Sequence, residues 1–315
     1  MYFTEEVYNC VKKEEIFVRK ALSSIDRGII YMLFASFLFA LMGAFAKLLS
    51  DHLPSIEIVF FRNIFGVFLI GATIWKLPLL NEGHRPWLLF FRGLMGFTAL
   101  LAFFYNIAHI SLADAMTFSK TSPIFTALLA YLFLQEDLSK KSWLALMLGF
   151  VGIVFITGGG LTFSKYDLLG ILSGLGAALA YTSVKELKKH YDTRAIVLSF
   201  MLVGSIGPII LMSIAPWVKA PSLDIFFAEF IMPSEWMWLQ IILMSSFATL
   251  AQVYMTKAYG VSKAGVVGAV SYTNIPFSII VGLVLGDSFP SMIVIMGIVF
   301  IVLSGLIVAK EKESH

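Results

Sequence analysis

Residues 108–137 read AHISLADAMTFSKTSPIFTALLAYLFLQED, and an altered copy of this stretch, AYGVSKAGVVGAVSYTNIPFSIIVGLVLGD, occupies residues 258–287. A shift of 151 positions aligns three pairs: Ser111 with Ser262, Ala113 with Ala264, and Glu136 with Asp287. The prolines of the two copies, Pro123 and Pro276, are two positions out of register. Both copies are typical of an apolar helix broken by a proline in its middle. A duplicated helix of this kind predicts a duplicated membrane protein.

The composition agrees with a chain that lies mostly in a lipid bilayer. Hydrophobic residues make up 59% of the 315 and charged residues only 14%, whereas soluble domains carry about 25% charged residues. The mean hydropathy is +0.87. This composition predicts an all-α integral membrane protein with no nucleic-acid partner. The single Cys10 leaves no intrachain disulfide or thiolate metal site, and we expect no metal and no cofactor.

Ten apolar runs predict ten transmembrane helices, at residues 28–50, 57–75, 86–109, 112–134, 141–158, 168–187, 194–215, 236–258, 262–285 and 290–308. They form two repeats of five helices, residues 28–158 and 168–308, followed by a tail at residues 309–315. Residues 1–27 place apolar side chains at helical spacing among Lys and Glu, which is typical of an amphipathic helix on the membrane surface. A plain solvated tail, or a start codon placed too early, is an equal alternative for this segment.

Basic residues gather in the connections on one side of the predicted membrane. That side receives Lys12, Lys13, Arg19, Lys20, Arg27, Lys76, Arg85, Lys140, Lys141, Lys188, Lys189, Arg194, Lys263, Lys310 and Lys312. The other side receives only Lys165 and Lys219. Because cytoplasmic loops carry the excess of Lys and Arg, we expect a multi-pass protein of a bacterial cytoplasmic (inner) membrane with both termini in the cytoplasm.

The two halves correspond beyond the opening stretch. Gly28 begins the first half as Gly170 begins the second, and at the same shift Phe39 corresponds to Tyr181. Each half holds an odd number of helices, so the halves must insert in opposite senses. Inverted repeats of this kind build many secondary transporters, which bind their substrate at the interface of the repeats.

The chain resembles the EamA type of the drug/metabolite transporter superfamily. The resemblance rests on the LADA sequence followed by a mid-helix proline and LQE, on the altered second copy of this stretch, and on the five plus five spans. The resemblance covers residues 28–308. Similarity to the subset that includes S-adenosylmethionine uptake carriers rests on Arg92-Gly93, Phe104-Tyr105 and residues 112–115. The resemblance implies a carrier but no particular substrate, because the superfamily carries amino acids, nucleotide precursors, cofactors and drugs. The second copy has Gly265 in place of Asp114, so the role of Asp114 is not symmetric.

Three basic residues fall well inside predicted spans: Arg62, Arg92 and Lys120. A charge at the centre of a membrane helix costs about 2.5–3.5 kcal/mol on insertion scales, so each of them needs a partner or water. One alternative is a structural ion pair with Glu57 or Asp114, which are also the candidates for proton coupling. The other is a substrate-binding cavity.

The neighbours of Lys120 and Arg92 favour a cavity. Lys120 lies one turn from Pro123, whose missing N–H leaves a backbone carbonyl for water or substrate. Arg92 shares a helical face with small, aromatic and polar residues: Gly96, Ala99, Phe103 and Asn106. This face suits the wall of a cavity better than a contact with lipid.

The second half supplies polar side chains instead of buried charges. Gln252 and Asn274 are the costliest of these to bury and are the candidates for the cavity wall, although polar stripes also occur in ordinary contacts between membrane helices. Tyr181 and Phe39 are either aromatic gates or interface packing. Pro276 is expected to break the ninth helix as Pro123 breaks the fourth.

We predict no enzyme, since the chain has no metalloprotease, P-loop or serine-elbow motif. The interpretation is a secondary transporter, monomeric or homodimeric, that moves a small anionic or zwitterionic metabolite by alternating access. We expect a substrate with negative charge because the predicted spans hold three inner cations but only two acids, Glu57 and Asp114. Two alternatives are a non-transporting receptor or scaffold, which needs no polar stripe, and a membrane-embedded lipid-modifying enzyme, which needs a clustered base or metal site.

Overall fold

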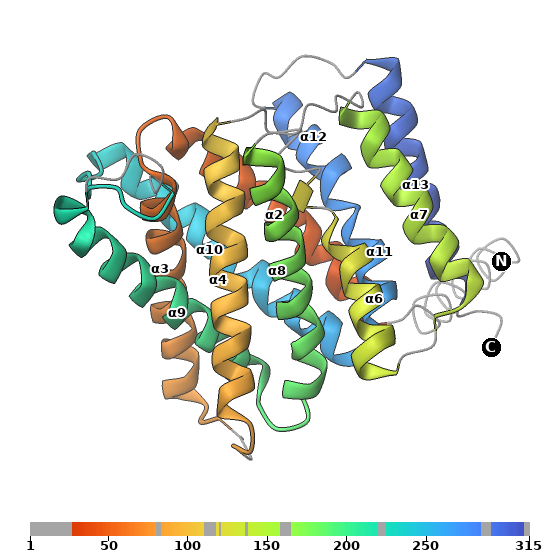
Figure 1. The fold of residues 1–315 in the computed structure, drawn as a ribbon, viewed down its shortest axis with the longest axis horizontal. Coiled ribbons are helices and arrows are strands. Elements are labelled where there is room, and N and C mark those ends of the chain that lie inside the picture. Colours follow the sequence, from red (N-terminus) through yellow and green to blue (C-terminus); the bar gives the residue numbers. More distant parts are fainter. Residues whose placement is uncertain are drawn as a thin grey trace, which may run out of the picture.

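The structure is a computed structural model that describes residues 27–79, 83–109, 118–119, 121–135, 138–157, 165–218, 225–284 and 291–311. All regular elements within these residues are helices (Figure 1), which confirms the all-α class. Seven helical segments in the described part of the chain are long and apolar enough to cross a membrane: Arg27–Ser50, Ser55–Lys76, Pro86–His109, Leu168–Leu187, Thr193–Trp217, Glu235–Val261 and Ala264–Val284. The predicted segment 1–27, apart from Arg27, lies outside the described residues.

Most of the described helices follow the apolar runs to within a few residues. The exceptions are the fourth run, predicted from residue 112, where the described helix begins at Ser122, and the ninth run, which holds two helices. They are α2 (Arg27–Ser50), α3 (Ser55–Lys76), α4 (Pro86–His109), α6 (Ser122–Leu134), α7 (Lys140–Thr157), α8 (Lys165–Leu187), α9 (Thr193–Ile214), the short 3-10 helix η1 (Ala215–Trp217), α10 (Glu235–Val261), α11 (Ala264–Ser271), α12 (Asn274–Val284) and α13 (Met292–Glu311). Apolar runs of this length therefore predicted the helices well, because such runs must satisfy their backbone groups internally when they cross lipid. The last helix continues to Glu311, into the predicted tail.

The prediction of a helix broken at its proline needs a correction. In the ninth run the break lies between α11 and α12, at Tyr272 and Thr273, and Pro276 occupies the first turn after it. A proline has no N–H to give the carbonyl four residues before it, and its ring clashes with that carbonyl. The carbonyl of Tyr272 instead accepts from the amide of Ile275 at 3.0 Å, so the chain stops one helix and starts another.

Pro123 also lies in the first turn of a helix and not in its middle. The described helix α6 begins at Ser122, and the amide of Thr121 closes a turn onto the carbonyl of Phe118 at 3.1 Å. Asp114 and Lys120 lie outside the described residues. In both copies of the opening stretch, proline thus begins a helix, the position where its missing N–H costs least.

Helices of the first half pack mainly against helices of the second half. The most extensive contacts join α2 with α10, α13 with α7, α4 with α8, and α3 with α9, and Figure 1 shows α4 beside α8 and α7 beside α13. Glycines let the helices of one of these pairs come close. A Cβ on Gly152 would lie 2.7 Å from the carbonyl oxygen of Gly297, so α7 and α13 touch through their backbones, as small residues permit in membranes.

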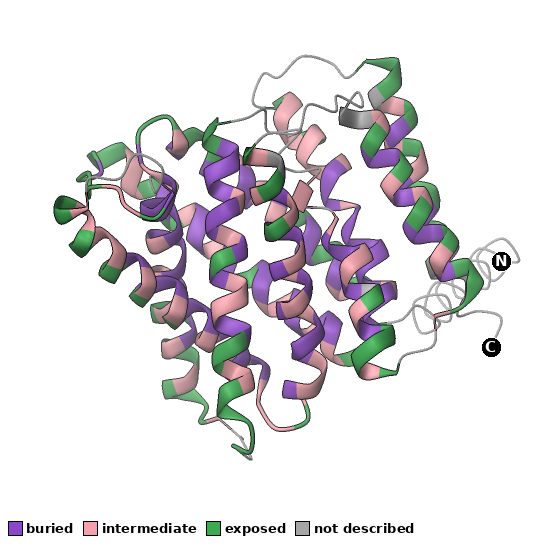
Figure 2. Cartoon of the chain, viewed as in Figure 1, coloured by how far each residue is buried: buried purple, intermediate pink, exposed green. Residues whose placement is uncertain are grey.

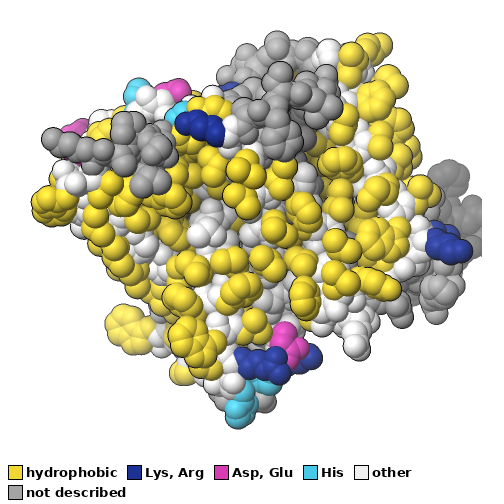
Figure 3. Space-filling view, viewed as in Figure 1, with side chains coloured by type: hydrophobic (Ala, Val, Ile, Leu, Met, Phe, Trp, Pro, Cys, Tyr) yellow, Lys and Arg dark blue, Asp and Glu magenta, His cyan; other side chains and the backbone are white. Residues whose placement is uncertain are grey.

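The outer surface of the bundle is apolar. Buried residues face inward and exposed residues outward (Figure 2), and hydrophobic side chains cover most of the face in Figure 3. Four exposed tryptophans lie at helix ends: Trp75 (90% exposed), Trp87 (80%), Trp217 (79%) and Trp236 (70%). Exposed tryptophans at both ends of an apolar bundle are typical of the two interfaces of a membrane.

Two basic connections that the sequence placed on one side of the membrane do lie together. The guanidinium of Arg194, at the start of α9, donates to the carbonyls of Leu77 (2.6 Å) and Thr73 (3.2 Å) at the end of α3. Arg85 forms an ion pair with Glu186 at 3.1 Å. Lys, Arg and Glu side chains gather at this lower end of the molecule in Figure 3. The connections after α3 and after α8 therefore share one end.

Candidate functional site

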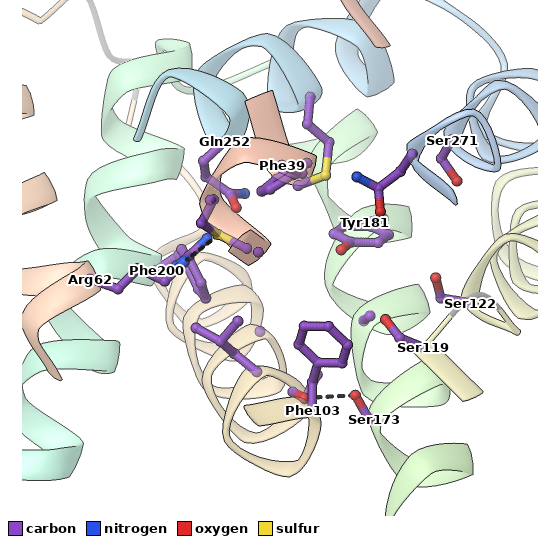
Figure 4. A pocket seen from close by; sticks show the side chains of 18 of the residues that line it. Phe39, Arg62, Phe103, Ser119, Ser122, Ser173, Tyr181, Phe200, Gln252 and Ser271 are labelled. Carbon is purple, nitrogen blue, oxygen red and sulfur yellow. Dashed lines mark hydrogen bonds between the residues drawn. The ribbon is translucent and has the colours of Figure 1, made fainter. Parts of the chain in front are cut away.

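A cavity of about 120 Å³ lies inside the bundle, between helices of both halves. Its wall takes side chains from α2, α3, α4, α8, α9 and α10, and from the helix ends around the two breaks. Figure 4 shows Arg62 and Phe200 at one end, Ser119, Ser122 and Ser271 toward the other, and Phe39, Phe103 and Tyr181 between them. The site therefore has a cationic end, an aromatic middle and a hydroxyl-rich end.

The cationic end is built on two buried arginines that share one aromatic ring. Arg62, from α3, is 2% exposed, and Arg92, from α4, is 1% exposed. Their Cζ atoms lie 5.4 Å and 4.8 Å from the centroid of Phe200, which α9 contributes. A guanidinium over an aromatic face is attracted by the ring quadrupole, but the ring supplies no negative charge.

Neither arginine makes an ion pair with a carboxylate in the described part of the chain. Nη1 of Arg62 donates to Oδ1 of Asn63 at 3.1 Å and its Nε to the sulfur of Met42 at 3.4 Å. Nε and Nη2 of Arg92 are buried and have no hydrogen-bond partner among the described residues. The predicted pairing with Glu57 is not formed, since Oε2 of Glu57 accepts from the amide of Ile231 at 3.0 Å.

Local packing fixes the position of both guanidiniums. The amide nitrogen of Asn63 donates to the carbonyls of Val59 (2.8 Å) and Gly204 (3.3 Å), which turns its oxygen toward Arg62. On α4, Gly96 makes room for Arg92, because a Cβ at Gly96 would lie 2.6 Å from Nη1 of that arginine. The same Cβ would lie 2.7 Å from the Phe200 ring.

The opposite end offers hydrogen-bond acceptors. The hydroxyl of Ser173 donates to the carbonyl of Ala99 at 2.7 Å, and that of Ser271 to the carbonyl of Gly268 at 2.7 Å. The amide nitrogen of Asn274 donates to the carbonyl of Ser36 at 2.8 Å. Each side chain therefore uses a donor within the protein, which leaves its oxygen lone pairs as acceptors.

Most of the sequence-predicted site residues meet at this cavity. Five line it: Arg62, Arg92, Tyr181, Gln252 and Asn274. Asn106 does not line it, because its amide nitrogen donates to the carbonyl of Tyr166 at 3.0 Å, at the end of the α4–α8 contact. Lys120 and Asp114 lie outside the described residues, and Ser119, next to Lys120 in the chain, lines the cavity.

The remaining predictions have structural roles beside the cavity. Pro123 packs against α11, where a Cβ on Gly268 would lie 3.1 Å from the proline Cβ. Tyr181 both lines the cavity and stacks on Tyr259, with ring centroids 5.1 Å apart. Gate and packing were offered as alternatives for Tyr181, and this residue does pack at the interface between α8 and α10.

Phe200, Ser119, Ser122 and Ser173 were not predicted, whereas Ser271 belongs to the polar stripe of the ninth run that also holds Asn274. The repeat itself holds a signal for Phe200: a shift of 138 positions aligns Ile58-Val59 with Ile196-Val197 and Gly66 with Gly204, and it places Arg62 on Phe200. No comparable signal marks Ser173 among the many Ser residues of the chain.

Comparison with known proteins places this chain among transporters. The profile of the EamA-like transporter family matches residues 26–158. An uncharacterized transporter of Helicobacter pylori is 32% identical over 90% of this chain and 94% of its own length. The pseudopaline exporter CntI of Pseudomonas aeruginosa is 30% identical over 93% of this chain and 99% of its own length. The S-adenosylmethionine uptake transporter of Rickettsia prowazekii is 22% identical over 93% of this chain and 96% of its own length.

A solved crystal structure shares the fold with a TM-score of 0.73, over 91% of this chain and 98% of the other, at 16% sequence identity. At that identity the likeness extends to the fold alone. The arrangement of helices around the cavity is thus one that another chain also adopts.

Proposed function

Because the chain belongs to the EamA-like transporter family, within the drug/metabolite transporter superfamily, we propose that it moves a small anionic or zwitterionic metabolite as a secondary transporter. The observation that carries this proposal is the pair of buried arginines in a cavity between the two halves, with no described carboxylate to balance them. A lone charge inside a membrane bundle is expensive and marks a substrate path.

The proposal includes ten transmembrane helices in two inverted repeats of five, with alternating access at the cavity between them. The helix contacts support it. In the proposed repeat α2 corresponds to α8 and α4 to α10, so the contact of α2 with α10 becomes the contact of α8 with α4 when the halves are exchanged. The contacts α3–α9 and α7–α13 each join two corresponding helices. Exchange of this kind is expected of a two-fold axis in the membrane plane. In such carriers one repeat rocks against the other around a fixed site.

For the membrane, we propose the bacterial cytoplasmic membrane, with both termini in the cytoplasm. The connections after α3 and after α8 lie at one end and carry Lys76, Arg85, Lys188 and Lys189. Cytoplasmic loops carry an excess of Lys and Arg, so we assign this end to the cytoplasm. One chain lines the whole cavity, so the transport unit is a monomer or one protomer of a homodimer.

The two other classes explain the cavity less well. A receptor or scaffold would gain nothing from two buried charges, whose insertion costs stability. A lipid-modifying enzyme would need a base or metal site at one interface, and the family and relatives are transporters and not enzymes. Lys120 stays a proposed third cation of the substrate path.

The test is uptake into proteoliposomes from an isotope-labelled metabolite extract, with the charge of each accumulated molecule read by mass spectrometry. The matched control is the Arg62→Met, Arg92→Met double variant at equal protein density. We expect anionic or zwitterionic solutes to accumulate with the wild type above the control. Equal contents in both, or accumulation of cations, would contradict the proposal.

A further inference from the structure

The two charges of the cavity call for two charges on the substrate. The guanidiniums of Arg62 and Arg92 both lie against the Phe200 ring, and neither forms an ion pair with a described Asp or Glu. A buried charge without a partner is strongly unfavourable. A ligand with one negative charge would balance only one of the two arginines, whereas a dianion would balance both.

The cationic end also holds unused donors. Nε and Nη2 of Arg92, and Nε2 of Gln252, are buried and unpartnered among the described residues. A guanidinium presents its N–H groups as a planar fork that fits a carboxylate or a phosphate with two parallel hydrogen bonds. Arg62 is held by Asn63 and Met42, which are uncharged and leave its charge in place.

The far end has the opposite character. Ser173, Ser271 and Asn274 direct their donors to backbone carbonyls, so they present oxygen lone pairs to the cavity. Acceptors of this kind pair with N–H or O–H groups and repel a second acid. The cavity therefore has charged donors at the arginine end and uncharged hydroxyl and amide groups at the serine end, where Ser173, Ser271 and Asn274 each keep an oxygen that can accept.

We propose that the transported molecule is an organic dianion with its acid groups at Arg62 and Arg92 and a hydroxyl or amino donor at Ser173, Ser271 and Asn274. This inference rests on the proposed function and narrows its substrate class. The acid chemistry is shared by two carboxylates and by one phosphate monoester. The donor chemistry is shared by alcohols and amines.

A panel of six probes on the wild-type protein separates these features. The readout is the thermal unfolding temperature in detergent, since a ligand that binds only the folded state raises it. The probes are malate and aspartate (two acids with a donor), succinate (two acids, no donor), glycerol 3-phosphate (phosphate with donors), and lactate and alanine (one acid with a donor).

We expect malate, aspartate or glycerol 3-phosphate to bind at least about tenfold more tightly than lactate and alanine, which is the effect of one charge-assisted hydrogen bond. Succinate should fall between the two groups. Tighter binding of malate than of aspartate would identify the donor as a hydroxyl, and the reverse as an amine. Comparison of glycerol 3-phosphate with these two shows whether the acid is a phosphate or a pair of carboxylates. Lactate or alanine binding as well as the dianions, or no stabilisation by any dianion, would overturn the inference.

A second test displaces Arg92 without removing a charge. In the Gly96→Ala variant the new Cβ would lie 2.6 Å from Nη1 of Arg92 and 2.7 Å from the Phe200 ring, so the contact between the guanidinium and the ring must change. The matched control is Gly71→Ala on α3, where an added Cβ meets nothing within 4 Å. We expect the affinity for the best dianion to fall at least about tenfold in Gly96→Ala only. Equal affinity in both variants would overturn the assigned role of Arg92.

The two proposals fail separately. If the labelled extract leaves no solute above the control, the proposed function fails. If zwitterions with a single acid accumulate and alanine stabilises the protein as well as aspartate does, transport stands and the dianion is wrong.

Discussion

Arg92 carries a positive charge inside the bundle with an aromatic ring, and no described carboxylate, beside it. Replacement by methionine removes a cost of about 2.5–3.5 kcal/mol on insertion scales, so we expect Arg92→Met to be at least as stable as the wild type. Its apparent affinity for substrate should nevertheless fall at least about tenfold. The measurements are thermal unfolding and initial uptake rate against concentration. Lower stability with normal affinity would mean that the arginine is structural.

Glu57 is the buried acid that the sequence offered as a partner for the cations, and the structure gives it another partner. Oε2 accepts from the amide of Ile231, in the segment that leads into α10. We expect Glu57→Ala to lose about 1.5–3 kcal/mol of unfolding free energy, the value of a hydrogen bond to a charged group. Glu57→Gln should lose less, because its amide oxygen can still accept.

The same two variants test proton coupling at Glu57. If the residue only holds the chain before α10, the pH dependence of uptake should be the same in Glu57→Gln as in the wild type. A loss of that dependence at normal stability would assign Glu57 to coupling.

At the scale of the element, Asp192 begins α9 and is expected to make its stability depend on pH. Its side chain accepts from the Arg194 amide at 2.8 Å and from the Arg194 guanidinium at 3.1 Å, and the side-chain bond to Arg194 lowers the pKa of Asp192. A carboxylate whose folded pKa is depressed adds stability above its unfolded pKa, and this stability is lost as the pH falls through the folded pKa.

We therefore expect Asp192→Asn to be less stable than the wild type at neutral pH, with a difference that shrinks as the pH falls below the ordinary range of an aspartate. Thermal unfolding across pH measures it. A difference that stays constant with pH would show that the charge of Asp192 adds nothing.

The contact of α7 with α13 depends on the absence of a side chain. The Cβ of a Gly152→Ala variant would lie 2.7 Å from a backbone carbonyl, which cannot swing away as a flexible side chain can. We expect a loss of about 1–3 kcal/mol, the usual cost of overpacking. Gly71→Ala, with open space around it, should be neutral or stabilising because alanine is the better helix former. Chemical unfolding of both variants makes the comparison, and equal stability would contradict the close contact.

Over the whole molecule, the apolar runs predicted the described helices because a membrane leaves a chain few other structures. The depth of Arg62 and Arg92 within their runs was likewise enough to identify them as residues that need a partner. The ninth run is interrupted at Tyr272 and Thr273, just before Pro276, because a proline acts on the carbonyl four residues before it. The sequence could not exclude a pair with Glu57, since that depends on how α3 meets the segment at Ile231. It could not reveal the acceptor end either, because which way a serine hydroxyl donates is decided by neighbouring backbone.

The central claim, a carrier that exposes one cavity to the two sides of the membrane in turn, is tested most directly by thiol labelling at Gln252. The residue is 3% exposed and lines the cavity. Ile242 on the same helix is 45% exposed and serves as the control. In a Cys10→Ser background, a membrane-impermeant reagent is added to right-side-out and to inside-out vesicles. We predict that Gln252→Cys reacts in both preparations, that the best dianion of the panel slows both reactions, and that Ile242→Cys reacts in neither. Reaction of Gln252→Cys from one side only, or from neither, would contradict alternating access.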